Sequence, residues 1–173
     1  FFLHVAGRMD APEVIRYLGR HGADLNSRED DGLHRHTALH WAVYQNARSA
    51  VVALLEQPGL DLETLDGHGT TALDVALRRQ AFEVAGLLLA AGARLNPETA
   101  LLALGLGSRQ ALDFVLSHVK DLDFLGPKTG MGPLHAAVAS GDAEAVARLL
   151  EAGADASLQC RRKFKRQGRE YPR

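Results

Sequence analysis

Residues 66–73 read DGHGTTAL, and the chain continues from them without interruption to GARLN at residues 92–96. Thr71 is followed three residues later by Asp74, which is the spacing of a capping box at the start of a helix. Alanine, valine and leucine are then frequent up to Gly92, a residue type suited to the left-handed conformation that ends many helices. This stretch therefore predicts two short helices, one beginning after Thr71 and one ending before Gly92.

The same pattern returns along the chain at a regular interval. Five segments share a Leu-His pair or its equivalent, and they are found at Leu3, Leu39, Leu73, Ala100 or Leu101, and Leu134. The separations are 36 and 34 residues between the first three, 27 or 28 to the fourth, and 34 from Ala100 to the fifth. One helical hairpin cannot bury both of its apolar faces, so we expect the copies to stack side by side.

The pattern of residues 66–96 and a period near 33 residues resemble the ankyrin-repeat family over residues 1–157. The resemblance implies an all-α fold, namely an ankyrin-repeat solenoid of stacked helix-turn-helix units with short β-hairpin fingers. The expected units are 1–29 (truncated), 30–63 (long finger), 64–96, 97–123 (no finger) and 124–157, followed by a basic tail at 158–173.

Two units depart from the regular pattern. The second has about three extra residues in its finger, within residues 30–36, and these should protrude toward the binding side. In the fourth, residues 96–99 (NPET) lead straight into an apolar helix and leave no room for a finger. We expect two helices there, at about 99–105 and 109–118. The fourth unit is then either a simple degenerate repeat or a notch in the finger row that a ligand could use.

Charge is unevenly distributed along the chain. The net charge is −1, from 20 basic and 21 acidic residues, but residues 158–173 hold seven basic residues against one acidic residue. Cys160 is the only cysteine, so an intramolecular disulfide is excluded, which fits an intracellular setting, cytoplasmic or nuclear. No apolar run reaches membrane-spanning length.

The two ends of the array indicate whether further repeats are expected. The first unit lacks its finger, and the last unit is not followed by a clearly polar capping repeat, which repeat arrays need for solubility. We therefore expect the array to extend further in at least one direction. The molecule should be a monomer or part of a longer chain.

The sequence has eight histidines but no catalytic motif. The phosphate-binding loop, the Gly-x-Ser-x-Gly elbow and the His-Glu-x-x-His metal motif are missing. His34 and His36 alternate and should face the same way, yet two histidines without a further carboxylate or thiolate make a poor metal site. We expect no enzyme activity, no metal and no cofactor in this segment.

The resemblance also assigns structural roles to individual side chains. In the family, the histidine of the Leu-His pair connects the capping threonine with backbone groups of adjacent fingers, and this role falls on His4, His40 and His135. Asp74 replaces the histidine in the third unit and is expected to cap its helix.

Covalent modification is an open alternative at three positions. Cys160 precedes two arginines and is either a reactive thiol or an incidental one. Asparagine hydroxylation, which the resemblance implies as an option, has loose matches at Asn26 and Asn96.

The resemblance implies a binding groove formed by finger tips and the exposed ends of the first helices. Tyrosine, methionine and arginine are enriched at protein interfaces. Carried over position by position, the partner-binding residues are Arg8, Met9, Leu33, His34, Arg35, His36, Tyr44, Gln45, His68, Thr70, Arg78, Arg79, Lys128 and Met131. Because this set leans basic, we predict a protein or peptide partner that presents an acidic or mixed polar segment.

Two other functions are compatible with the sequence. The tail contains RRKFKR at residues 161–166, which could bind nucleic acid or an anionic membrane, or act as a nuclear import signal. Alternatively, the repeats recruit substrates for an enzymatic domain in a larger multidomain enzyme or signalling protein.

Overall fold

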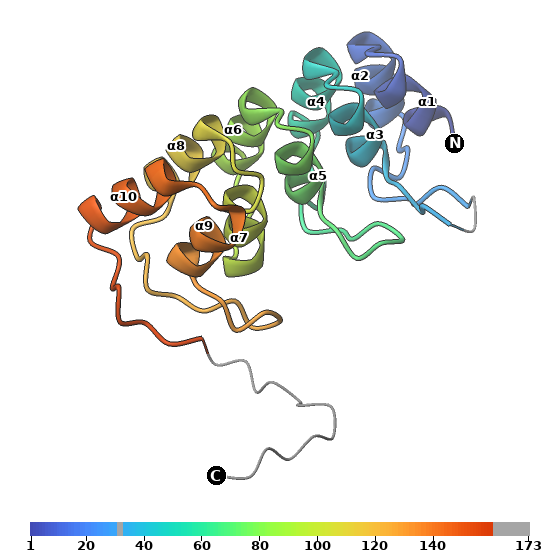
Figure 1. Ribbon diagram of the computed structural model, residues 1–173. Coiled ribbons are helices and arrows are strands. Elements are labelled where there is room, and N and C mark those ends of the chain that lie inside the picture. The colour runs from blue at the N-terminus through green and yellow to red at the C-terminus, as the bar shows by residue number, and fades with distance from the viewer. Residues whose placement is uncertain (31–32, 161–173) are drawn as a thin grey trace, which may run out of the picture.

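The computed structural model in Figure 1 describes residues 1–30 and 33–160. Ten helices form within that part of the chain, and they follow one another in pairs. The first helices of the pairs are α1 (Phe2–Arg8), α3 (Ala38–Tyr44), α5 (Ala72–Arg78), α7 (Pro97–Leu104) and α9 (Pro133–Ser140). The second helices are α2 (Pro12–Arg20), α4 (Arg48–Leu55), α6 (Phe82–Ala90), α8 (Arg109–His118) and α10 (Ala143–Glu151).

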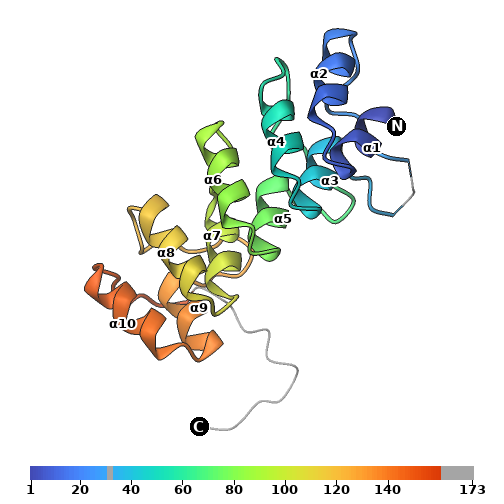
Figure 2. The ribbon, with the colours of Figure 1, turned by 90° about the horizontal axis from the view of Figure 1, so that it is seen from above.

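The helices form two layers. Each first helix contacts the first helices of the neighbouring units, and the second helices contact one another in the same order. Figures 1 and 2 show the pairs side by side from α1 and α2 to α9 and α10, with loops projecting from the first-helix layer. The predicted all-α solenoid is therefore confirmed.

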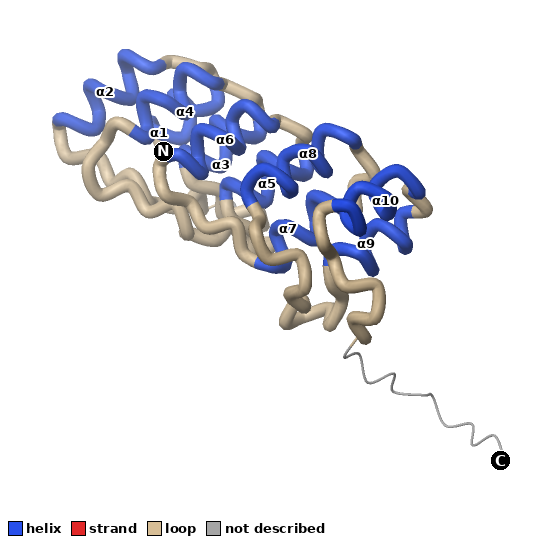
Figure 3. Tube along the Cα trace, turned by 90° about the vertical axis from the view of Figure 1, so that its left-hand side faces the viewer, coloured by secondary structure: helices blue, strands red, loops and turns tan. Residues whose placement is uncertain are grey.

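The fingers are hairpin turns without regular strands: within residues 1–30 and 33–160 no residue is in a β-strand (Figure 3). A backbone hydrogen bond joins the two sides of each of three fingers. The donor and acceptor residues are Glu29 and His36 (2.9 Å), Asp66 and Thr70 (2.9 Å), and Gly126 and Met131 (2.8 Å). The fingers are therefore turns and loops rather than paired strands.

Helix starts and stops follow the chemistry seen in the sequence. The Thr71 hydroxyl accepts from the Asp74 amide at 3.2 Å, and the Asp74 carboxylate accepts from the Thr71 amide at 3.0 Å, which completes the capping box of α5. Thr37 caps α3 in the same way. Gly92 follows α6 with a φ of 103°, a conformation that residues with a side chain rarely adopt.

The fourth unit has two helices and a short entry. Only residues 91–96 connect α6 to α7, whereas residues 56–71 connect α4 to α5 and include the third finger. Helix α7 begins at Pro97, two residues before the predicted start, because the Asn96 side chain accepts from the Thr99 amide at 2.9 Å and proline suits the first helical position.

Small side chains hold the layers together. Ala42, Ala50, Ala76 and Ala85 are fully buried and lie in the core with large residues such as Leu54. Because alanine adds little width, adjacent helices approach closely and large side chains fill the space between the layers. The finger row therefore rests on a continuous helical platform.

Candidate functional site

His40 connects the start of α3 to the third finger. Its Nε2 donates to the Thr70 carbonyl at 3.1 Å, and its Nδ1 accepts from the Thr37 hydroxyl at 2.8 Å and from the Thr37 amide at 3.3 Å. His40 is 1% exposed, so these bonds satisfy a buried ring that is neutral. His40 thus fixes the finger against the first-helix layer, as predicted from its position in the repeat.

The other residues at this position show how the role depends on the next finger. His4 Nε2 donates to the Ser27 carbonyl at 2.9 Å, on the way into the second finger. His135 Nδ1 accepts from the Gly132 amide at 3.2 Å, within its own helix cap. Two of the three predicted histidines therefore bridge to the following finger.

Asp74 occupies the same position where no finger follows. Its Oδ1 accepts from the Thr99 hydroxyl of α7 at 2.7 Å, while its Oδ2 caps α5 through the Thr71 amide. A histidine here would have no finger carbonyl to bond, whereas a carboxylate can accept from a hydroxyl on the next helix. The predicted capping role of Asp74 is confirmed, and the contact with Thr99 is additional.

Stability should decrease on mild acidification because of His40. Burial lowers the pKa of His40 below its ordinary value of 6.5, outweighing the opposing effects of the Thr70 carbonyl and the Asp66 charge. A group whose folded pKa is depressed stabilises the fold fully above its unfolded pKa and loses that contribution as the pH falls. We expect the urea midpoint of unfolding to decline as the pH is lowered from 7 to about 5, and to decline less in a His40→Asn variant. A decline of equal size in both proteins would contradict this assignment.

Asp66 organises the third finger beneath His68. Its carboxylate accepts from the Thr70 hydroxyl at 2.8 Å and from the Thr70 and His68 amides at 2.9 Å each. Burial acts to raise the pKa of Asp66, but the hydrogen bonds that its carboxylate accepts lower the pKa by more than burial raises it. The pKa of Asp66 therefore lies below its ordinary value of 3.8. Asp66 is therefore ionised at neutral pH, and its carboxylate holds the turn of the third finger closed.

Aromatic rings and arginines meet beside the second and third fingers. The Arg79 guanidinium lies over the Tyr44 ring at 4.4 Å, and the Arg8 guanidinium lies over the Trp41 ring at 5.7 Å from its centroid. The Trp41 indole donates to Glu29 at 2.7 Å, which fixes the ring. Stacking on a ring holds a guanidinium in place and leaves its edge free to bind a carboxylate.

These rings border a cavity of about 310 Å³ between the two fingers. His34 and His68 also line it, and His34 Nδ1 lies 3.1 Å from His68 Nε2, so one ring donates to the other. Trp41 was not predicted as a site residue. The sequence signal for Trp41 is that it is the only tryptophan and directly follows His40, and the structure places it half-buried in α3.

The predicted partner-binding residues divide by exposure. Exposed ones are Arg8, Met9, Leu33, Arg35, Tyr44, Gln45, His68, Arg78, Arg79 and Lys128, and half-buried ones are His34 and Met131. His36 and Thr70 are each only 8% exposed, so expecting them at the surface was wrong. His36 lies edge-on against Trp41 with 5.0 Å between centroids, and the Thr70 hydroxyl is held by Asp66.

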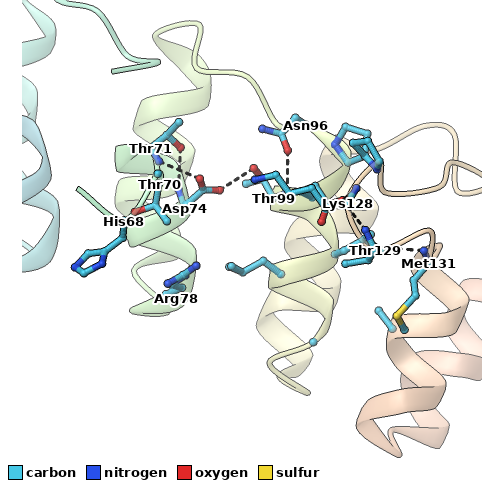
Figure 4. Close-up of a pocket in the computed structure, with 18 of the residues that line it drawn as sticks. His68, Thr70, Thr71, Asp74, Arg78, Asn96, Thr99, Lys128, Thr129 and Met131 are labelled. Atoms are coloured by element: carbon cyan, nitrogen blue, oxygen red, sulfur yellow. Dashed lines mark hydrogen bonds between the residues drawn. The ribbon is translucent and has the colours of Figure 1, made fainter. Parts of the chain in front are cut away.

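A larger cavity of about 790 Å³ opens where the fourth finger is missing. Figure 4 shows it between Thr71, Asp74 and Arg78 on one side and Lys128 and Met131 on the other, with Thr99 on α7 between them. The volume lies within the range of about 300–1,000 Å³ seen for ligand sites. Of the two sequence interpretations of this unit, a plain degenerate repeat or a notch, the geometry favours the notch.

Within residues 1–30 and 33–160, no group of three or more His, Cys, Asp or Glu side chains could hold a metal ion. In the same part of the chain no helix has the length and apolar character needed to cross a bilayer. Cys160 is exposed. The basic cluster at residues 161–166 lies outside the described residues.

Family comparisons match most of the repeat array. A family model described as ankyrin repeats (3 copies) matches residues 3–99, and one described as ankyrin repeat matches residues 129–161. Most of the fourth unit, residues 100–123, lies between the two matches.

Several known proteins are similar to the chain. It is 29% identical over 171 residues to "Putative palmitoyltransferase ZDHHC13" of Danio rerio, covering 91% of this chain and 25% of that protein. It is 36% identical over 75 residues to "Ankyrin repeat and SOCS box protein 6" of Homo sapiens, covering 43% of this chain and 17% of that protein. The chain thus spans a quarter or less of the length of these relatives.

Among solved structures, the chain is similar to the ankyrin repeat domain of Bcl-3, a member of the IkappaB protein family. The TM-score is 0.83 at 30% sequence identity, and the match covers 91% of this chain and 72% of that one. The helical layers and the order of the units are therefore shared over nearly the whole array.

Proposed function

This chain belongs to the ankyrin-repeat family, whose repeats are protein–protein interaction modules, and we propose that its finger and first-helix face binds an acidic or mixed polar segment of a partner protein. The observation that carries the proposal is the pair of ring-stacked arginines, Arg8 on Trp41 and Arg79 on Tyr44. Arginine, tryptophan and tyrosine are the residue types that contribute most of the binding energy at many protein interfaces.

The arginine–carboxylate ion pairs among the described residues lie in the second-helix layer. In the second-helix layer, Arg16, Arg109 and Arg148 pair with carboxylates of the same protein. In the first-helix layer, Arg8, Arg78 and Arg79 have no carboxylate within ion-pair distance among the described residues. Arg20 and Arg48 of the second-helix layer also have no ion pair among the described residues. What favours the first-helix face for an anionic ligand is that Arg8 and Arg79 lie over the Trp41 and Tyr44 rings.

Reversing the charge of Arg78 and Arg79 together should weaken partner binding. We expect the Arg78→Glu/Arg79→Glu variant to bind its captured partner at least about tenfold more weakly, because close like charges are unfavourable at an interface. Partners are captured from cell extract on the immobilised chain, identified by mass spectrometry, and their affinity is then measured by biolayer interferometry.

The matched control carries the same charge change on the other layer. Arg20 and Arg48 lie in α2 and α4 and are exposed, so Arg20→Glu/Arg48→Glu should leave the affinity unchanged. Equal affinity in the wild-type chain and the Arg78→Glu/Arg79→Glu variant would contradict the proposal. Equal weakening in both variants would point to a general charge effect and contradict it as well.

A second candidate function is the recruitment of substrates for an enzyme within a longer protein. The observation that favours it is the similarity, over 91% of this chain, to a quarter of the Danio rerio protein named as a palmitoyltransferase. Ankyrin repeats themselves are a binding scaffold and not a catalytic one, so the reaction would belong to another part of such a protein. Sequencing the transcript on both sides of these residues tests this alternative.

A further inference from the structure

The finger row is interrupted while the helical platform beneath it is continuous. Helix α7 contacts both α5 and α9, so the first-helix layer has no gap. In contrast, residues 91–96 connect α6 to α7 without forming a finger. On this side of the third finger, the next finger is therefore that of the fifth unit, at residues 126–131 (Figure 1). The space that a fourth finger would fill is the cavity of about 790 Å³.

Adjacent fingers normally hold each other through their backbones. The Gly67 amide of the third finger donates to the His34 carbonyl of the second at 2.6 Å. The third finger also borders the cavity, which Leu65, Gly69 and Thr70 help to line. An extended segment from another protein could therefore lie against the third finger in the place that a fourth finger would occupy.

The carboxylates that line the cavity are already engaged. The Glu98 carboxylate accepts from the Lys128 amide at 2.6 Å and the Thr129 amide at 3.2 Å, which fixes the fifth-unit finger. Asp74 is held by Thr71 and Thr99. The carboxylates therefore hold the walls of the cavity in place.

The cations that line it are not engaged. Arg78 and Lys128 are exposed on opposite sides of the cavity, and neither is in an ion pair with a described carboxylate. The charged donors available to a ligand are thus an arginine and a lysine. A carboxylate is the complementary group.

The wall between these two cations is apolar. Leu102 of α7 and Met131 are half-buried in the cavity, and Leu65 at its edge is 44% exposed. Covering an exposed leucine with an apolar side chain of a partner removes apolar surface from water, which favours binding. Methionine adapts its shape to such a partner.

From these observations we propose that the notch binds an extended partner segment with a large apolar side chain flanked by acidic residues. The apolar side chain lies against Leu102 and Met131, and the acidic residues pair with Arg78 and Lys128. This inference rests on the proposed function and names one part of the partner. The chain's own basic tail has the same sign of charge as Arg78 and Lys128, so charge complementarity favours a separate acidic segment.

The test uses the whole chain and a fluorescein-labelled peptide, Glu-Asp-Leu-Asp-Phe-Glu, in fluorescence anisotropy. Two control peptides replace the acids with their amides or the leucine and phenylalanine with alanine. We expect each control peptide to bind at least about tenfold more weakly than the probe, and Lys128→Glu to weaken the probe to a similar degree. Met131→Glu should do the same, and thermal unfolding checks that both variants fold.

The matched control is Arg48→Glu, because Arg48 is exposed on α4 in the second-helix layer and does not line the notch. Its probe affinity should equal that of the wild-type chain. Equal probe binding by the wild-type chain and Lys128→Glu, or no preference for the acidic apolar peptide, would overturn the inference. If Arg78→Glu/Arg79→Glu loses the captured partner while Lys128→Glu retains it, the proposed function stands and the notch inference fails. A tenfold tighter probe after deletion of residues 158–173 would show that the tail competes for the notch and would also overturn it.

Discussion

Replacing His40 with alanine is expected to lower the free energy of unfolding by about 3 kcal/mol, because the variant loses a buried ring and leaves the polar groups around it without partners. The ring is 1% exposed and bonds to Thr37 and Thr70 from both nitrogens. Alanine supplies none of these bonds. The Thr70 carbonyl keeps the Asp66 amide as a donor but loses the ring N–H, and the buried Thr37 amide and hydroxyl lose the ring nitrogen that accepts from them.

Urea unfolding followed by circular dichroism measures this loss. The matched control is His21→Ala, since His21 is exposed and its Nδ1 bonds only to the Tyr17 carbonyl one turn earlier. We expect the control to change stability by less than about 0.5 kcal/mol, as for most surface substitutions. A loss below 1 kcal/mol in His40→Ala would show that the finger is held by other contacts.

The regular part of the fold is readable from local chemistry. Thr71 and Asp74 have capping-box spacing, Gly92 marks a helix end, and the copies recur near one fixed period. Each of these signals acts within a few residues, so one sequence is enough to detect it. Stacking then follows, because one hairpin cannot bury its own apolar faces.

Contacts between units were not predictable in the same way. Arg79 meets Tyr44, and Arg8 meets Trp41, across neighbouring units whose relative twist sets the meeting point. The same limit explains the wrong expectation for His36, which turns inward against Trp41 from the longer second finger. A period predicts which units are neighbours, but side-chain pairing depends on the angle and distance between their helices.

Asp74 and the missing fourth finger are one feature that sequence analysis treated as two. Where a finger follows, His4 and His40 donate to its carbonyls at Ser27 and Thr70. Where none follows, Asp74 accepts from Thr99 on the next helix. A histidine-to-aspartate change at this position is therefore a sequence signal for a missing neighbour, provided that a hydroxyl residue follows at the right distance.

Gly67→Ala should destabilise the protein by about 1–3 kcal/mol, the cost of overpacking a tight contact. A Cβ on Gly67 would overlap the Leu33 carbonyl oxygen and lie 2.8 Å from the His34 carbonyl oxygen. Both are backbone atoms, so neither can rotate away as a side chain would. The hydrogen bond from the Gly67 amide to His34, which joins the second and third fingers, would lengthen or break.

Gly86→Ala is the contrasting substitution, because a Cβ there meets no atom within 4 Å in α6. It should raise the free energy of unfolding by about 0.5–1 kcal/mol, since glycine is unfavourable inside a helix. Urea unfolding of both variants compares the signs, and hydrogen exchange at residues 33–36 reports on the second finger. If Gly67→Ala were as stable as Gly86→Ala, the two fingers would not be in backbone contact in solution. The cavity lined by His34, His68 and Arg79 would then lack the rigid walls that an anion-binding face requires.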